Sequence, residues 1–472
     1  MLFNSSVFAI FLCIVFCLYW FVFKQIKQQN ILLLLASLFF YGWWDWRFLS
    51  LICFSSVLDF AIGLALQNTQ IQSKRKWLLI TSIVVNIGLL FTFKYYNFFV
   101  ESFIYVFHTF GINLNIQTLS IILPLGISFY TFQTLSYTID VYKRVFEPTK
   151  DIIAFMAYIS FFPQLVAGPI ERASNLLPQF FRKRTFDKTF ALEGLKIMLW
   201  GFFKKIVIAD GISVLIDPIF KSPEYYSGGT LAIAGVLFAV QIYADFSGYS
   251  EIAIGTARLF GFRLMKNFNY PYFASSIIDF WKRWHISLTS WFKDYIYIPL
   301  GGNRHGLRKQ IINTCIIFIV SGIWHGANFT FILWGVAHAI FFIPGILFRK
   351  KIYAIPAYAN SILIIGKILY TNCIVILLWF LFRAQSIEDV VIIFSKIFSA
   401  DIFELNTTFP FHIFVLVCIL MITEWFGRRN DYAIVGIAGN APRMVRWSIY
   451  YGIMITILYY FETPLNYIYF QF

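Results

Sequence analysis

Apolar stretches long enough to form membrane helices follow one another along almost the whole chain. A helix needs about 20 apolar residues to cross the hydrocarbon core of a bilayer. Hydrophobic residues make up 59% of the 472 residues and charged residues only 13%, whereas soluble domains carry about 25% charged residues. We therefore expect an all-α polytopic membrane protein with about 11 to 12 transmembrane helices plus re-entrant segments. The expected spans are Val7–Phe23, Ile31–Trp44, Phe48–Leu66, Trp77–Phe107, Leu119–Ile139, Phe190–Ile216, Gly229–Phe246, Ile311–Ile323, Phe329–Phe348, Ser361–Phe382, Phe411–Phe426 and Ser448–Phe461.

Basic residues lie in short clusters between these stretches and predict the orientation of the chain. The formal net charge is +15, and lysine and arginine accumulate in the cytoplasmic loops of membrane proteins. With the N-terminus outside, the clusters all face the cytoplasm, provided that Ile152–Ile170 enters the membrane and returns. This distribution argues against nucleic-acid binding. The clusters include Lys74–Lys76, Arg182–Arg184, Lys282–Arg283, Arg349–Lys351 and Arg428–Arg429.

No internal repeat, soluble domain or low-complexity linker is evident in the sequence. We expect residues 1–472 to form a single membrane domain, with a motif-bearing core near 119–348 flanked by helices in 1–118 and 349–472. The six cysteines lie in or beside apolar stretches, and none of the usual zinc-ligand spacings occurs, so we predict no metal site. The sequence also lacks a phosphate-binding P-loop and a G-x-S-x-G serine motif.

Polar residues interrupt the apolar pattern in three places. Because a polar or charged side chain in lipid costs free energy, each of these places is a candidate functional segment. The segment Phe161–Arg172 contains two prolines and a glycine, so it is either a structural loop or a re-entrant segment that lines a cavity. A second stretch, Gln241–Leu300, includes Asp245 and an amphipathic pattern over 277–295. We expect one helix there, with an apolar stripe on one face and Lys282 and His285 on another.

The third interruption, Ser321–Asn328, lies between two apolar arms that predict a helical hairpin. His325 would therefore be buried between the arms, where a neutral imidazole is tolerated and a charged one is not. Such a group can accept a proton from an attacking hydroxyl as a general base. His338 is a weaker candidate on the second arm. An interfacial histidine with a purely structural role is the alternative interpretation of His285.

These stretches resemble the signature of the membrane-bound O-acyltransferase (MBOAT) family over nearly the full length. The resemblance rests on the run Asp279–Leu288, which reads DFWKRWHISL, its continuation to Arg304 through PLGGNR, and the downstream GIWHG at Gly322–Gly326. Further matches are Phe162–Gln164, Ala167–Ile170, Asp245–Ser250 and Phe382–Ala384. The PLGGNR ending is similar to the branch of alginate and peptidoglycan O-acetyltransferases.

The resemblance implies an MBOAT fold and an O-acyltransferase of the bacterial cytoplasmic (inner) membrane. It implies that His325 is catalytic and that His285 assists it or positions the donor. It also implies acetyl-CoA as the cytoplasmic acyl donor, a glycan acceptor outside, and an extracytoplasmic SGNH-type partner protein. Asp245 or Asp294 could orient a histidine, with Trp324 and Asn328 as further supporting residues of the site.

Lys282, Arg283, Arg304 and Arg308 could attract the phosphates of the donor, although an ordinary cytoplasmic-side cation is the commoner explanation for any one of them. Three alternatives remain open at this point. They are D-alanyl transfer to teichoic acid, a transporter or flippase without covalent chemistry, and a scaffold for polysaccharide secretion. The paired histidine motifs favour the acyltransferase.

Overall fold

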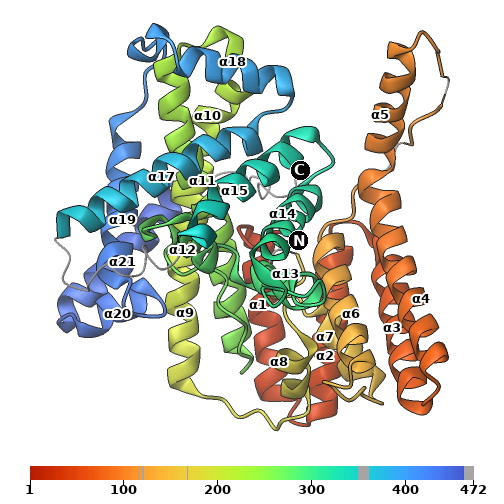
Figure 1. Ribbon diagram of the computed structural model, residues 1–472. Helices are drawn as coiled ribbons and strands as arrows, with labels where there is room; N and C mark the ends of the chain where they lie inside the picture. The colour runs from red at the N-terminus through yellow and green to blue at the C-terminus, as the bar shows by residue number, and fades with distance from the viewer. Residues whose placement is uncertain (115, 120–121, 167, 349–360, 462–472) are drawn as a thin grey trace. The chain divides into compact units, whose positions relative to one another are not determined.

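The computed structural model describes residues 1–114, 116–119, 122–166, 168–348 and 361–461, and every regular element in these ranges is a helix (Figure 1). Six helices are long and apolar enough to cross a membrane, and shorter apolar helices lie at Ser6–Val22 and Phe411–Gly427. The expectation of an all-α, multi-pass membrane protein is thereby confirmed. The six long spans are Trp46–Asn68, Gln72–Thr109, Gly228–Leu259, Gly306–His325, Phe329–Leu347 and Ile362–Arg383.

The first of two compact units comprises residues 1–195 and 253–265. Its buried centre is α6, which packs against α3 and α4. The carboxylate of Asp59 on α3 accepts hydrogen bonds from Ser82 and Asn86 on α4 and from Thr138 on α6. Such a network satisfies polar groups that lipid could not. The helices are α1 (Ser6–Cys17), η1 (Leu18–Val22), α2 (Ile26–Gly42), η2 (Trp46–Phe48), α3 (Leu49–Asn68), α4 (Gln72–Leu90), η3 (Phe91–Tyr95), α5 (Tyr96–Thr109), α6 (Ile127–Tyr142), α7 (Ile152–Ser160), α8 (Ala173–Leu176) and η4 (Leu177–Phe180).

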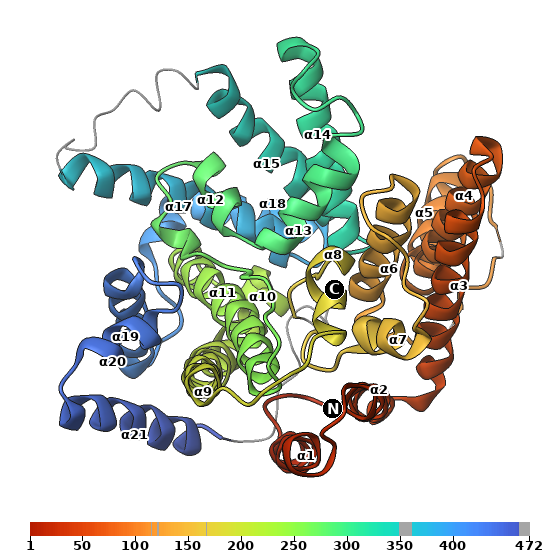
Figure 2. The same cartoon turned by 90° about the horizontal axis from the view of Figure 1, so that it is seen from below.

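The second unit comprises residues 196–252 and 266–472. One of its helices, α11, is 83% buried over its most apolar 18 residues, whereas each of the other long spans is at most 39% buried. Figures 1 and 2 show α11 running beside α10. The helices of this unit are α9 (Lys188–Phe202), η5 (Phe203–Asp210), α10 (Gly211–Lys221), η6 (Pro223–Tyr225), α11 (Gly228–Leu259), η7 (Pro271–Phe273), α12 (Ile277–Arg283), α13 (Ile286–Phe292), η8 (Lys293–Tyr297), α14 (Gly306–His325), α15 (Phe329–Leu347), α17 (Ser361–Arg383), α18 (Ile387–Ile397), η9 (Ala400–Phe403), α19 (Phe411–Gly427), α20 (Ala433–Asn440) and α21 (Arg443–Tyr459), of which α9 begins and α11 ends in the first unit.

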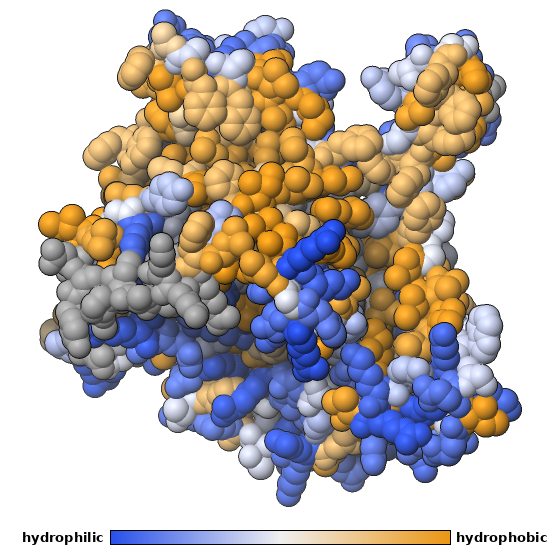
Figure 3. Space-filling model, viewed as in Figure 1, coloured by the Kyte–Doolittle hydropathy of each residue, from blue (hydrophilic) through white to orange (hydrophobic). Residues whose placement is uncertain are grey.

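The surface of the first unit separates apolar from polar residues along the direction of α4. Figure 3 shows hydrophobic residues along the flank of α4 and hydrophilic ones where α3 and α4 are joined. This turn is followed at once by Lys74 and Lys76, both exposed. The separation agrees with a lipid-facing flank that ends in a basic loop outside the hydrocarbon core.

Two expectations about helix limits were wrong. The span expected to begin at Leu119 begins at Ile127, because Pro124 and Gly126 precede it and Gly126 has a φ of 73°. The single helix expected over 277–295 is divided into α12 and α13, and His285 lies at the break with a φ of 44°. In the first unit, the described residues that follow α7, 161–166 and 168–172, are not helical, as the prolines there predict.

Candidate active site

His285 occupies a strained position between two short helices. It is 1% exposed, and its backbone is left-handed, with φ 44° and ψ 54°. A residue with a Cβ atom rarely adopts this conformation, and strain of this kind concentrates at functional sites. The break turns the chain so that the histidine no longer continues the face of α12.

Asn267 holds the imidazole of His285 in one tautomer. The amide oxygen of Asn267 accepts hydrogen bonds from the backbone nitrogen and the hydroxyl of Ser287, at 3.3 and 2.9 Å, which identifies it as the oxygen. This oxygen lies 3.1 Å from Nδ1 of His285, while the amide nitrogen donates to Ser250. Since an amide oxygen only accepts, Nδ1 must carry the hydrogen. The lone pair of His285 is therefore on Nε2.

Burial keeps His285 neutral. It lowers the pKa of His285 to about 3, because an enclosed imidazolium loses its hydration. The ring is surrounded by aromatic side chains, with Phe246 at 4.6 Å and Trp324 at 5.9 Å between ring centroids. At neutral pH the side chain is an uncharged imidazole that can accept a proton at Nε2.

His325 is the last residue of α14 and is 4% exposed. Three rings enclose it, with centroid distances of 4.9 Å to Trp324, 5.1 Å to Trp334 and 5.2 Å to Phe382. These rings come from α14, α15 and α17, so three helices fix the position of one imidazole. The hairpin expected around Ser321–Asn328 is present, with α14 and α15 as its arms.

Glycines allow the two arms of the hairpin to approach each other closely. A Cβ atom on Gly322 would lie 2.3 Å from the backbone oxygen of Phe331, and one on Gly326 would lie 2.1 Å from the Phe331 ring. Both distances are far below van der Waals contact. The glycines of the GIWHG motif are therefore required by packing on either side of His325.

Trp324 connects the two histidine motifs. Its ring lies next to that of His285 and next to that of His325. Asn328, which follows, caps α15 by accepting from the backbone nitrogen of Thr330 at 3.0 Å, and its amide donates to the Gln385 carbonyl at 2.7 Å. Trp324 thus belongs to the site, while the contacts of Asn328 are those of a structural residue.

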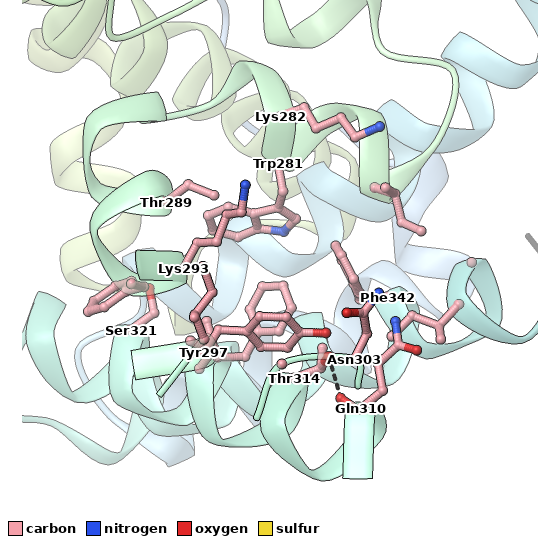
Figure 4. Close-up of a pocket in the computed structure, with 18 of the residues that line it drawn as sticks. Trp281, Lys282, Thr289, Lys293, Tyr297, Asn303, Gln310, Thr314, Ser321 and Phe342 are labelled. Carbon is pink, nitrogen blue, oxygen red and sulfur yellow. Dashed lines mark hydrogen bonds between the residues drawn. The ribbon is translucent and has the colours of Figure 1, made fainter. Parts of the chain in front are cut away.

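A pocket of about 610 Å³ lies beside these motifs (Figure 4). We call it the large pocket. Figure 4 shows the ammonium groups of Lys282 and Lys293 on the side of Trp281, with Asn303 and Gln310 opposite. Its wall includes Leu288, Ser321 and Arg304, so it adjoins both motifs, although neither His285 nor His325 lines it. The volume suits a drug-sized ligand.

The candidate donor-binding cations separate into two pairs. Lys282 and Arg304 line the large pocket, but Arg283 and Arg308 do not. Arg283 instead pairs with Asp279 one helical turn earlier, at 2.9 Å. Lys293 lines the pocket and was not predicted, because in the sequence it is only one more cation in an amphipathic stretch.

The two candidate orienting carboxylates have separate environments. Asp245 lies 2.8 Å from the Lys205 ammonium group, which also pairs with Asp210, so its charge is engaged in a buried cluster on η5 and α11. Asp294 is partly exposed on η8. The residue that sequence reasoning missed is Asn267, which supplies the hydrogen bond to His285. Only its position in an otherwise aromatic run could have drawn attention to it.

His338 contacts a residue that lines the large pocket, Trp281. It is fully buried on α15, and the indole nitrogen of Trp281 donates to its Nδ1 at 3.2 Å. Its ring lies 4.7 Å from that of Trp334, which also contacts His325. His338 therefore contacts Trp281 of the pocket wall and Trp334 of the rings around His325. Within the described ranges, no group of three His, Cys, Asp or Glu side chains could hold a metal ion.

Comparison with known proteins gives a family match and several long relatives. The membrane-bound O-acyltransferase (MBOAT) family matches over residues 145–382. A probable alginate O-acetylase of Pseudomonas aeruginosa is 37% identical over 441 residues, which cover 92% of this chain and 82% of the relative. A peptidoglycan O-acetyltransferase of Helicobacter pylori is 35% identical over 422 residues, covering 82% and 78%. A teichoic acid D-alanyltransferase of Bacillus subtilis is 26% identical over 227 residues, covering 46% and 57%.

Proposed function

The chain belongs to the membrane-bound O-acyltransferase family, and we propose that it transfers an acetyl group from cytoplasmic acetyl-CoA to a hydroxyl on the outer side of the bacterial inner membrane. That it is a multi-pass membrane O-acyltransferase follows from the family and from its helices. The donor, the acceptor and the roles of individual residues are the proposal.

The observation that carries the proposal is the pair of buried histidines on either side of Trp324. His285 is neutral, with its lone pair on Nε2. His325 is enclosed by aromatic rings that come from three helices. A buried neutral imidazole is the group that can take a proton from a hydroxyl inside a membrane.

The proposed step is an attack of a hydroxyl oxygen on the thioester carbonyl. His325 accepts the hydroxyl proton, the new C–O bond forms, and the C–S bond breaks. The coenzyme A thiolate then takes up the proton, so the histidine is regenerated. If transfer proceeds in two steps, His325 instead carries the acetyl group between donor and acceptor. In either case His285 positions the thioester or assists His325.

The large pocket is the proposed site for the donor. Lys282, Lys293 and Arg304 supply three cations at its wall, and the donor carries phosphates that such groups attract. Leu288 and Trp281 supply apolar surface for the rest of the donor. Residues of α13, which directly follows His285, and of α14, which ends at His325, line the pocket.

The acceptor is proposed to be an extracytoplasmic polysaccharide or peptidoglycan, reached directly or through an SGNH-type partner protein. The alginate and peptidoglycan relatives match this chain over much greater lengths than the D-alanyltransferase does. This difference favours acetyl over D-alanyl transfer. D-alanyl transfer remains the second candidate, because its enzyme shares the family.

The test is transfer of label from radioactive acetyl-CoA to polymer or partner protein in membranes that contain the full chain. We expect transfer by the wild type and by His412→Ala, in which an exposed histidine is removed, and loss of transfer by His325→Ala at equal protein level. A parallel assay uses a D-alanyl donor. Label from that donor alone would overturn the acetyl assignment, and full activity of His325→Ala would overturn the role of His325.

A further inference from the structure

A second cavity, of about 550 Å³, lies in the first unit, away from the histidine motifs in the chain. We call it the basic cleft. Five cations line it, against one carboxylate, that of Asp187. The Asp187 carboxylate is already used, because it accepts from the backbone nitrogens of Thr189 and Phe190 at the start of α9. The five cations are Arg182, Lys183, Arg184, Arg258 and Arg263.

Two of these cations have structural partners within the unit. Arg184 donates to the side chains of Gln29 and Asn30, and Arg258 pairs with Glu193 at 2.8 Å. For Arg182 and Lys183, which are both exposed, no ion pair with another described residue occurs. The cleft therefore holds positive charge that the surrounding protein does not neutralise.

The third exposed cation, Arg263, is fixed in position. The side chain of Gln179 accepts from the backbone nitrogen of Arg263 and donates to its carbonyl, both at 2.9 Å. The guanidinium groups of Arg263 and Arg258 each lie 4.9 Å from the centre of the Phe190 ring. Cation–π contacts of this length hold a guanidinium without consuming its outer hydrogen-bond donors. A side chain that is already held in place loses less conformational entropy when it binds a ligand than a mobile one does.

Aromatic and apolar side chains border the cleft on the side of α1. Trp20 lines it, and its ring packs against Phe186 with a centroid distance of 5.4 Å. Phe186 is 51% exposed, and the helix that carries Trp20 also has the exposed apolar residues Ile14 on α1 and Phe21 on η1. The indole nitrogen of Trp20 donates to the Leu259 carbonyl at 2.9 Å. Tryptophan with basic residues at the end of an apolar helix is typical of the membrane interface.

From this juxtaposition we propose that the basic cleft binds the phosphate group of an anionic membrane lipid, with the lipid tails against the apolar face of α1. Arg182, Lys183 and Arg263 contact the phosphate, and Trp20 and Phe186 contact the start of the tails. A lipid supplies both kinds of contact at once, whereas free phosphate uses only the cations. The site is separate from the proposed donor pocket, so it does not depend on the proposed acetyl transfer.

The experiment measures how the purified full-length chain in neutral detergent retains fluorescent phosphatidylglycerol and fluorescent phosphatidylcholine. The test variant is Arg182→Gln/Lys183→Gln/Arg263→Gln, which leaves the paired Arg184 and Arg258 in place. The matched control, Lys74→Gln/Lys76→Gln/Lys150→Gln, removes the same charge from exposed positions of the same unit. We expect the test variant to lose about tenfold in phosphatidylglycerol affinity and the control to keep it.

Two further arms identify the source of the phosphate. Phe186→Ala should weaken retention of phosphatidylglycerol, and millimolar inorganic phosphate should compete poorly with it. Equal retention by the wild type, the test variant and the control would overturn the proposal. Full displacement by inorganic phosphate, with no effect of Phe186→Ala, would overturn the lipid and leave a soluble phosphate ligand. Arg263→Gln alone, checked for a monodisperse elution profile, covers the case in which the triple variant does not fold.

Discussion

The two buried histidines of this enzyme are held by different kinds of contact. His285 depends on a hydrogen bond to Asn267 and on a strained backbone between two helices. His325 depends on a cage of three aromatic rings and on glycines that let α14 and α15 meet. Polar contacts set a protonation state, whereas ring contacts set a position. We infer that the tautomer matters most for His285 and the location for His325.

The strongest test of this comparison is to remove each imidazole in turn and then both. We expect His325→Ala to lower the transfer rate by about 1,000-fold, because a general base contributes on the order of 10² to 10⁴. We expect a loss of similar size for His285→Ala, because His285 assists that base. If the two act as one unit, the double variant should be no slower than the slower single variant. The measurement is the initial rate of label transfer in membranes with equal protein levels.

Independent roles of His285 and His325 would contradict the proposal that they act as one unit. In that case the losses in the double variant would multiply. His412→Ala is the control for loss of a histidine as such, since His412 is exposed on α19.

A second test concerns the hydrogen bond that distinguishes His285. Asn267→Leu should lower the rate by about 10- to 100-fold, because it removes the partner of a buried donor, at a cost of roughly 1–3 kcal/mol. Asn267→Asp keeps an acceptor and adds a negative charge, which favours the imidazolium and raises the pKa of His285 from about 3.

The pH profile separates these two variants. In the wild type, His285 stays neutral from above pH 3 upwards, so it contributes no acid limb between pH 5 and 8. With Asn267→Asp, activity should fall as the pH drops through the new, higher pKa, because the imidazolium has no lone pair on Nε2 with which to position the thioester or assist His325. An unchanged profile at full activity would show that Asn267 does not act through His285.

A third test asks whether the large pocket binds the acyl donor that the histidines are proposed to act on. Lys282→Gln/Arg304→Gln should raise the KM for acetyl-CoA by about 10-fold with little change in kcat, as expected when about 1.4 kcal/mol of charge attraction is lost in the ground and transition states alike. Arg283→Gln should change KM less than twofold, because Arg283 pairs with Asp279 outside the pocket. Equal effects of the two variants would contradict the donor assignment of the pocket.

The smallest effects on transfer should come from substitutions in the α14–α15 hairpin around His325, which change mainly the stability of the fold. Gly322→Ala should destabilise the folded protein by about 1–3 kcal/mol, since the new methyl group would collide with the Phe331 backbone. Asn328→Ala should cost about 1 kcal/mol through loss of the α15 cap, with the transfer rate kept. Thermal unfolding in detergent measures both, and Gly366→Ala, with no atom within 4 Å, is the matched control. A stable Gly322→Ala variant would show that the hairpin can open.

The sequence predicted the class of fold and the family better than it predicted the path of the backbone. Spans such as Phe329–Phe348 agree with α15, because about 20 apolar residues leave few other structures in lipid. The helix expected over 277–295 was wrong, because a periodic apolar pattern continues across a break that lasts only two residues. The roles of His325, His285 and the proposed donor cations stay predictions.

The amino-acid sequence by itself determined that the chain lies in a membrane, that its fold is all-helical and that it carries the family motifs. These features depend on the length of apolar runs and on short motifs, which are formed by residues close together in the sequence. What tertiary structure decided is which groups meet. Asn267 reaches His285 from 18 residues away, and Phe382 encloses His325 from α17. The separation of Lys282 from Arg283, adjacent in sequence but different in partners, likewise depends on the direction in which α12 faces its neighbours. Contacts between distant segments follow from packing, and no local pattern encodes them.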